Sequence, residues 1–478
     1  MSFVSFEFAI LFLVTVPLFY LLPHKRRWIL VLIASYAFYM SWKASYIIII
    51  MVTTLCDFHI AKAIHASNAP TRRRFLLGLS LAMNFGILFT FKYYNFLAGS
   101  IDNAALAMGL DWALPAFRLL LPVGVSFYTF QEVAYVVDVY RGVLPPERRL
   151  GIFATFIAFF PQLVAGPIER AKHMIPQFHN PVSFIPANVV EGFRFMLWGA
   201  FKKVVIADRL AVYVNEVYGH PGDFSGGTLF IATLFFAFQI YCDFSGYSDI
   251  AIGVARTMGF DLMTNFRQPY YATSVREFWQ RWHISLSTWF KDYLYFPLGG
   301  NRLGKARWKI NILIVFLVSG IWHGANWTFV VWGALHGCYL VAEQILEARI
   351  GGWHPRMGSR LRDGARILLT FTLVTVAWVF FRAQNISQAV GVLSSIASDL
   401  RFDRNELGMV FGSKEELLIC AGLIAALMGA DRLLLKGGWT PLLARLGTPA
   451  RWTLYYALAV AVFLLGHWGS QEFIYFQF

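Results

Sequence analysis

Long apolar runs are the feature that most constrains how this chain can fold. The clearest are FEFAILFLVTVPLFYLL (6–22), FLLGLSLAMNFGILFTF (75–91), LFIATLFFAFQIY (229–241), ILLTFTLVTVAWVFF (367–381) and LYYALAVAVFLLGHW (454–468). Several approach the roughly 17 to 25 residues that a helix needs to cross hydrocarbon. Only helices and closed barrels satisfy their backbone polar groups in lipid, and the alternation typical of barrel strands is absent. The runs therefore predict transmembrane helices.

Composition supports a membrane protein. Of the 478 residues, 58% are hydrophobic and 14% are charged, whereas soluble domains carry roughly 25% charged residues. We count about 11 spanning or re-entrant segments by length and hydropathy. The sequence shows no internal repeat and no break in composition, so we expect an all-α polytopic protein with one membrane-embedded domain over residues 1–478.

Basic loops predict the orientation of the chain. HKRR (24–27) and RRR (72–74) follow the first and third predicted spans, and basic residues dominate the stretch 266–310. Short basic loops are retained on the cytoplasmic side, so we expect an outer N-terminus and a cytoplasmic stretch 266–310. Basic cytoplasmic loops account for most of the net charge of +14, so the charge does not require nucleic-acid binding as an explanation.

Two carboxylates interrupt an otherwise apolar stretch, YCDFSGYSDIAIG (241–253). Asp243 and Asp249 are six residues apart, a spacing that does not stack them on one helical face. Intramembrane carboxylates are often functional, but we interpret this pair as ending a helix, pairing with the basic loop or lining a tunnel. We expect them to do no chemistry.

A second stretch, residues 276–302, is both aromatic and basic. It could form an amphipathic helix at the inner interface. Alternatively, Arg276, Arg281 and Lys291 could bind a phosphate-bearing ligand, because arginine can grip phosphate with two hydrogen bonds. His283 lies within this stretch, and a lone histidine there is more often a structural hydrogen bonder.

The segment SGIWHGANWT (319–328) places a titratable side chain inside a predicted span. His323 would lie about 21 Å along a helix that begins near Lys309, where a buried imidazole is costly unless it faces a cavity or a partner. Gly324 and Asn326 should interrupt the helix, and Trp322 and Trp327 should wall a dry pocket. A catalytic base and a hydrogen-bonded core histidine both remain open from these residues alone.

These motifs together resemble the membrane-bound O-acyltransferase superfamily, and within it the alginate O-acetyltransferase membrane subunits and their close relatives. The similarity includes REFWQRWHISLSTWFKDYLYFPLGGNR (276–302), SGIWHGANWTFVVWGALHG (319–337), LLPVGVSFYTFQEVAYVVDVYRG (120–142), FPQLVAGPIERAKHMIPQF (160–178), CDFSGYSDIAIG (242–253) and FIYFQF (473–478). It therefore extends over nearly the whole chain.

The resemblance implies many helices around a central tunnel, entered by acetyl-CoA from the cytoplasm and by the acceptor from the other side. The family's invariant histidine corresponds to His323, the expected base, and its second polar position corresponds to His283. His283 and Asn326 are expected to position the acceptor or to donate to the oxyanion. Arg276, Arg281 and Lys291 are expected to hold the phosphates of coenzyme A. Acetyl-CoA acts as a substrate, and neither a metal nor a permanently bound cofactor is expected.

The resemblance also implies a setting in the bacterial inner membrane. The acceptor would be an extracytoplasmic polysaccharide, most simply one like alginate, with cellulose and peptidoglycan as alternatives. The chain carries no GxSxG serine motif, so we expect the acetyl group to pass through a periplasmic acetyltransferase partner in a complex. The competing hypotheses are a transporter or flippase for an acyl or glycan intermediate, and an acyltransferase for another group such as D-alanine.

Overall fold

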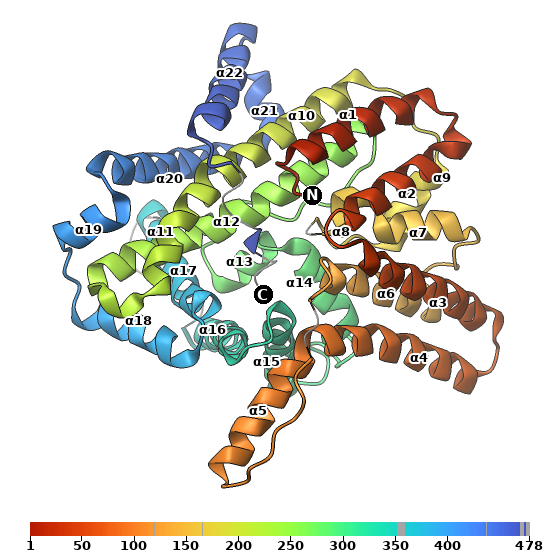
Figure 1. The fold of residues 1–478 in the computed structure, drawn as a ribbon, viewed down its shortest axis with the longest axis horizontal. Helices are drawn as coiled ribbons and strands as arrows, with labels where there is room; N and C mark the ends of the chain where they lie inside the picture. Colours follow the sequence, from red (N-terminus) through yellow and green to blue (C-terminus); the bar gives the residue numbers. More distant parts are fainter. Residues whose placement is uncertain (118–119, 165, 351–358, 436, 469–472, 475–478) are drawn as a thin grey trace. The chain divides into compact units, whose positions relative to one another are not determined.

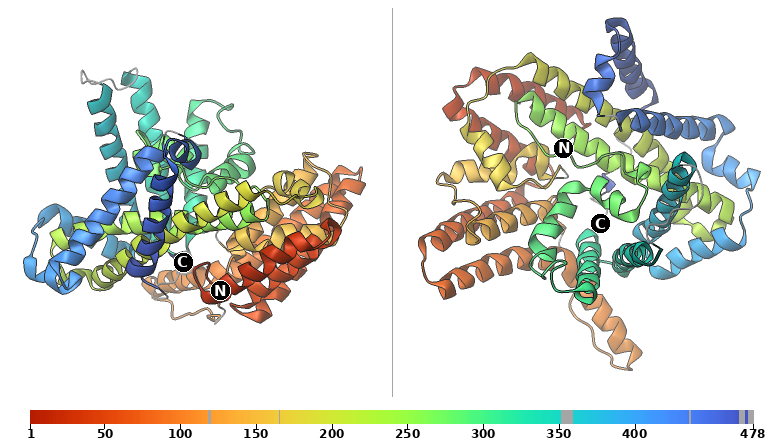
Figure 2. Two further views of the ribbon diagram at one scale, coloured as in Figure 1. Left: turned by 90° about the horizontal axis from the view of Figure 1, so that it is seen from above. Right: turned by 180° about the vertical axis from the view of Figure 1, so that it is seen from behind.

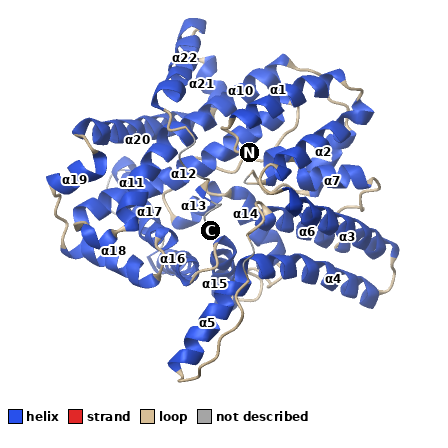
Figure 3. Ribbon diagram, in the orientation of Figure 1, coloured by secondary structure: helices blue, strands red, loops and turns tan. Residues whose placement is uncertain are grey.

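The computed structural model describes residues 1–117, 120–164, 166–350, 359–435, 437–468 and 473–474. These residues form helices and loops without a strand (Figure 3), so the all-α prediction is confirmed. They divide into two compact units, one comprising residues 1–196 and 248–263 and the other residues 197–247 and 264–478. The expectation of a single domain over residues 1–478 stays a prediction.

Seven helices are long and apolar enough to cross a membrane, counted over the described residues. They are Ala44–Ala66, Pro70–Ala107, Gly226–Thr257, Trp327–Arg349, Arg360–Arg382, Lys414–Leu434 and Thr448–Leu465. Two shorter apolar helices, Phe6–Leu21 and Ile386–Ser398, add to them. The apolar runs in the sequence therefore identified a multi-pass membrane protein correctly.

The first unit is a set of packed helices, with α1 to α4 in neighbouring positions (Figures 1 and 2). Its helices are α1 (Phe6–Leu21), α2 (His24–Met40), α3 (Ile47–Ala66), α4 (Pro70–Leu88), α5 (Tyr94–Ala107), α6 (Val125–Tyr140), α7 (Leu150–Ala158), α8 (Phe160–Leu163) and α9 (Ala171–His179). A π-helical turn, η2 (Phe89–Tyr93), joins α4 to α5. Helix α6 packs against α3 and α4 and buries most of its length.

The second unit carries the histidine motifs. Its elements are η3 (Phe201–Ala207), α11 (Asp208–Gly219), α13 (Val275–Arg281), α14 (Ile284–Phe290), η6 (Lys291–Tyr295), α15 (Lys305–His323), α16 (Trp327–Ile350), α17 (Ser359–Arg382), α18 (Ile386–Ser398), α19 (Arg404–Phe411), α20 (Lys414–Leu434), α21 (Trp439–Ala444) and α22 (Thr448–Leu465). Two further helices, α10 (Pro186–Ala200) and α12 (Gly226–Thr257), contribute residues to both units. Of the FIYFQF motif, residues 475–478 lie outside the described residues.

Helices α15 and α16 form a tight hairpin because glycines face each other where they cross (Figure 1). A Cβ atom added at Gly333 would lie 2.3 Å from the carbonyl oxygen of Phe316, and one at Gly320 would lie 2.3 Å from that of Phe329. Small residues allow membrane helices to approach this closely. The hairpin therefore fixes the end of α15 relative to the start of α16.

We predict that Gly333→Ala lowers the melting temperature in detergent, because the added methyl group must push the two backbones apart at a cost of about 1 to 3 kcal/mol. The matched control is Gly422→Ala in α20, where an added Cβ meets nothing within 4 Å. An exposed glycine replaced by alanine in a helix should leave stability unchanged or raise it. Equal melting temperatures for the two variants would contradict close packing at Gly333.

Candidate active site

His323 is the last residue of α15. Gly324 continues the chain in an extended conformation and α16 begins at Trp327, so the predicted interruption after His323 is confirmed. A Cβ atom at Gly324 would lie 2.1 Å from the ring of Phe329, which explains the need for glycine there. The His323 side chain is buried by the aromatic residues described next.

Three aromatic rings enclose the His323 imidazole. The centroids of Trp332, Trp322 and Phe381 lie 4.9, 5.0 and 5.5 Å from that of His323. The residue is only 3% exposed. A neutral imidazole in such a dry site can accept a proton without competition from bulk water.

His283 lies in the turn between α13 and α14 and has left-handed backbone angles of φ 42° and ψ 54°. Histidine adopts this region more readily than most residues, but the position is still uncommon. Asn265 holds the turn, because its Oδ1 accepts from the backbone N–H of Ser285 at 3.2 Å and from the Ser285 hydroxyl at 2.9 Å. These two hydrogen bonds therefore stabilise the strained turn.

The same amide oxygen fixes the tautomer of His283. Nδ1 of His283 lies 3.2 Å from Asn265 Oδ1, and an amide oxygen can only accept, so Nδ1 carries the proton. His283 lies outside the candidate spans and is fully buried, and this burial lowers its pKa to about 3. The ring is therefore neutral, and Nε2 is a hydrogen-bond acceptor.

The structure brings the two histidines together although they are 40 residues apart in sequence. Their ring centroids lie 6.5 Å apart at an angle of 60°, and the Trp322 ring lies 6.2 Å from that of His283. Phe244 of α12 packs edge-on against His283 at 4.6 Å. Three separate segments, α12, the turn between α13 and α14, and α15, thus meet around the two histidines.

A third histidine was missed by the sequence analysis. His336 of α16 is fully buried, and its Nδ1 accepts a hydrogen bond from the indole N–H of Trp279 at 3.2 Å. Trp332 lies between His336 and His323, with its centroid 4.9 Å from each ring. The only available signal was its position four residues after Trp332, which places both side chains on one helical face.

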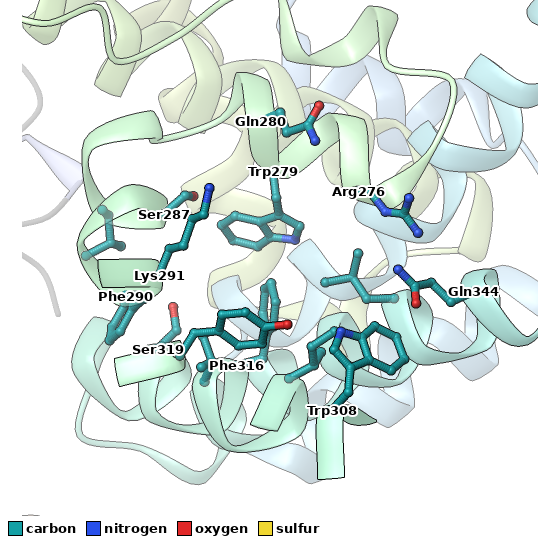
Figure 4. A pocket seen from close by; sticks show the side chains of 15 residues that line it. Arg276, Trp279, Gln280, Ser287, Phe290, Lys291, Trp308, Phe316, Ser319 and Gln344 are labelled. Carbon is teal, nitrogen blue, oxygen red and sulfur yellow. The ribbon is translucent and has the colours of Figure 1, made fainter. Parts of the chain in front are cut away.

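A cavity of about 250 Å³ adjoins this cluster in the second unit (Figure 4). Figure 4 shows Trp279 between Lys291 on one side and Arg276 with Gln344 on the other. Ser319 also lines the cavity, and it precedes His323 by one helical turn on the same face of α15. Neither His283 nor His323 lines the cavity, so the cavity does not contain the two histidines.

Arg276 and Lys291 line this cavity, as expected of a phosphate site, but Arg281 does not. The Arg281 guanidinium instead forms an ion pair with Glu277. Burial alone would raise the pKa of Glu277, but hydrogen bonds from Thr273 and the charge of Arg281 outweigh it and lower that pKa. Arg281 is therefore engaged in supporting α13.

Asn326 lies in the predicted break between α15 and α16, but Trp327 does not wall the pocket. Asn326 caps α16, because its Oδ1 accepts from the Thr328 N–H at 3.0 Å and its Nδ2 donates to the Gln384 carbonyl at 2.8 Å. Trp327 is 52% exposed. Trp332 therefore walls the pocket in place of Trp327, because helical periodicity turns position 332 toward His323 and position 327 away.

Asp243 does not end a helix, so that interpretation is wrong. Asp243 and Asp249 both lie inside α12. Asp243 pairs with Lys203 of η3, with 2.7 Å between Nζ and Oδ1, and not with the basic loop. Its Oδ2 accepts from the backbone N–H of Ile474 at 2.8 Å. These contacts support the expected structural role of Asp243, which stays a prediction.

Comparison with known proteins identifies the class of protein. The model of the membrane-bound O-acyltransferase family matches residues 150–382, and the chain belongs to this family. It is therefore a multi-pass membrane O-acyltransferase, and the enzyme prediction is confirmed over the transporter alternative.

Individual relatives show which acyltransferases this chain resembles. The chain is 38% identical over 434 residues to the probable alginate O-acetylase AlgI of Pseudomonas putida, an alignment that covers 90% of this chain and 87% of the relative. It is 34% identical over 392 residues to the peptidoglycan O-acetyltransferase of Helicobacter pylori, covering 76% and 72% of the two chains. The teichoic acid D-alanyltransferase of Streptococcus thermophilus is 29% identical over 289 residues, covering 55% and 68%.

Proposed function

We propose that this enzyme transfers an acetyl group from cytoplasmic acetyl-CoA to a hydroxyl group, as a step in the O-acetylation of an extracytoplasmic polysaccharide. The observation that carries the proposal is the buried pair of His283 and His323, whose centroids are 6.5 Å apart in an aromatic chamber. Two neighbouring hydroxyl groups of an acceptor lying between the rings could each donate to one imidazole nitrogen. Such a chamber excludes the water that would hydrolyse a thioester.

In the proposed reaction, His323 removes the proton of the acceptor hydroxyl as its oxygen bonds to the thioester carbonyl carbon. The carbonyl π electrons move to oxygen and form an oxyanion. When the C=O bond re-forms, the C–S bond breaks, and the departing thiolate takes the proton from His323. His283 carries its proton on Nδ1, so it orients the acceptor by accepting at Nε2 a hydrogen bond from a second hydroxyl group of the acceptor.

The proposed donor route is the cavity beside Arg276 and Lys291. Their charges suit the phosphates of coenzyme A, while Trp279, Trp308 and Phe316 give the cavity an apolar wall suited to the pantetheine chain. Because basic residues dominate the stretch 266–310, we place the entrance on the cytoplasmic side.

We predict that Arg276→Glu with Lys291→Glu weakens acetyl-CoA binding about tenfold or more, because each hydrogen bond to a charged group contributes about 1.5 to 3 kcal/mol. The loss should be larger at low salt. A double variant of the exposed residues, Arg302→Glu with Lys305→Glu, changes the net charge equally and does not touch the cavity. Calorimetric titration at two salt concentrations should give a lower acetyl-CoA affinity for the cavity variant than for the control variant. Equal affinities would place the phosphate site elsewhere.

For the acceptor we propose an alginate-like polymer, on the basis of the 38% identity to a probable alginate O-acetylase. The peptidoglycan O-acetyltransferase relative makes peptidoglycan the next candidate, and cellulose remains a third. We place the enzyme in the bacterial inner membrane beside a periplasmic acetyltransferase, which would receive the acetyl group and deliver it to the polymer.

The test is reconstitution of the protein in liposomes with acetyl-CoA labelled in the acetyl group. Release of coenzyme A together with label on an added alginate oligosaccharide, or on a co-purified periplasmic protein, supports the proposal. The relationship to teichoic acid D-alanyltransferases makes D-alanine the competing acyl group. Transfer of D-alanine from a carrier protein, with acetyl-CoA left intact, would overturn the acetyl assignment.

A further inference from the structure

Acyl transfer needs hydrogen-bond donors where the carbonyl oxygen becomes negative, and both residues first expected to supply them are engaged in other hydrogen bonds. Asn326 uses its amide to cap α16 and to bind Gln384. The Nδ1–H of His283 donates to Asn265, which leaves only an acceptor at Nε2. The oxyanion therefore requires other donors.

Two buried N–H groups beside His323 meet this need. The indole Nε1 of Trp332 and the imidazole Nε2 of His336 are enclosed by protein, and within the described part of the chain neither has a hydrogen-bond partner. Both residues are fully buried. A buried donor without a partner costs about 1 to 3 kcal/mol, so such a group calls for a specific explanation, such as a ligand or a bound water.

The protonation of His336 follows from its contact with Trp279. An indole nitrogen can only donate, so the 3.2 Å bond from Trp279 makes Nδ1 of His336 an acceptor. The neutral ring then carries its proton on Nε2. Trp279 thereby holds His336 in the donor form while it also lines the cavity proposed for the acyl donor.

Trp332 lies next to both His336 and the proposed base. Trp332 and His336 are four residues apart on α16, and their ring centroids are 4.9 Å apart at 70°. Trp332 is also 4.9 Å from His323. Trp378 stacks on Trp332 at 5.9 Å and Phe381 packs against it at 5.4 Å, so the indole is held from the other side by aromatic rings.

We propose that the N–H groups of Trp332 and His336 donate hydrogen bonds to the thioester carbonyl oxygen and stabilise the oxyanion that forms there. This assignment rests on the proposed acyl transfer and names the groups that complete it. Fixed donors in a dry site act strongly because they need no reorientation as charge develops. Trp279 is a positioning residue in this arrangement, because it acts through His336.

The test uses the full-length protein and an isosteric change. Trp332→benzothienylalanine replaces the indole N–H by sulfur and keeps the two-ring shape, and Trp332→Phe removes the same donor more coarsely. Loss of one oxyanion donor should lower kcat about 10² to 10³ fold while acetyl-CoA affinity stays within about twofold of the parent. His336→Asn, which keeps an oxygen to accept from Trp279, should lower kcat in the same way. Trp198→Phe removes a buried indole that packs on Phe201 and Trp439 and should leave kcat unchanged.

A spectroscopic readout separates this inference from the proposed function. In unreactive His323→Ala protein, the carbonyl band of bound [1-¹³C]acetyl-CoA should move to lower frequency than in water. That shift should shrink when position 332 is benzothienylalanine. Binding with an undiminished shift would overturn the role of Trp332 while leaving acetyl-CoA as the donor. Failure of the parent protein to bind acetyl-CoA would overturn both.

Discussion

Replacing His323 by alanine should abolish acyl transfer while leaving the protein folded and able to bind acetyl-CoA. A general base contributes about 10² to 10⁴ in rate, and no base from bulk water can replace one that is 3% exposed among aromatic rings. His323→Ala should therefore show no turnover above background. The proposed role lies in the transfer step, so acetyl-CoA affinity should remain close to that of the parent.

The measurements are coenzyme A release, label on the acceptor and a thermal melt of each variant. His283→Ala is the informative comparison, because a residue that orients the acceptor should raise the acceptor concentration required and leave some turnover. A stable His323→Ala protein that acetylates within about tenfold of the parent would make His323 a structural residue. The base would then be His283 or a group on the partner.

Sequence reasoning selected His323 and His283 as candidate site residues because their motifs carry strong local signals. An imidazole followed by Gly324 within an apolar run predicts an interrupted helix, and α15 does end at His323. Resemblance to a known family related the two histidines across 40 residues. Neither signal could reveal the tautomer of His283, because this depends on Asn265, a residue with no recognisable motif.

The structure differs from the sequence-based expectations at aromatic and basic residues that lie close together in the sequence. Trp327 and Trp332 are the same residue type on the same helix. Only the rotation of α16 about its axis decides which of the two rings packs against His323. Arg281 and Arg276 belong to one short helix and each pairs with a glutamate, Glu277 and Glu347 respectively, yet only Arg276 lines the cavity. His336 was passed over because its role depends on the indole of Trp279, which reaches it from a different helix.

The ion-pair partner of Asp243 also could not be predicted from the sequence. Lys203 lies in the π-helical segment η3, with Nζ 2.8 Å from Asp208 Oδ1 and 2.7 Å from Asp243 Oδ1. All three side chains are nearly fully buried. Asp243 also accepts from the backbone of Ile474, and Phe473 packs against Phe244, the ring that contacts His283. The ion cluster therefore connects α12 to the chain's final described residues behind the site.

Lys203→Met should be the most destabilising of the substitutions considered, because it leaves two buried carboxylates of like charge without their shared cation. Removing one partner of a buried ion pair costs about 3 to 5 kcal/mol. The variant should melt well below the parent in detergent, and a protease should cleave it more readily near Phe473 and Ile474. Lys414→Met, at an exposed position on α20, removes the same charge and should change nothing.

Combining Lys203→Met with Asp243→Asn tests whether unpaired charge causes the loss of stability. Asp243→Asn alone keeps the shape of the side chain and leaves Lys203 paired with Asp208, so its stability and turnover should remain near those of the parent. Combined with Lys203→Met, it removes one of the two unpaired carboxylates and should restore part of the lost stability, which makes the two changes non-additive. Additive losses would mean that Lys203 stabilises the fold through the packing of its aliphatic chain. Loss of turnover in stable Asp243→Asn protein would instead assign this carboxylate a part in the chemistry.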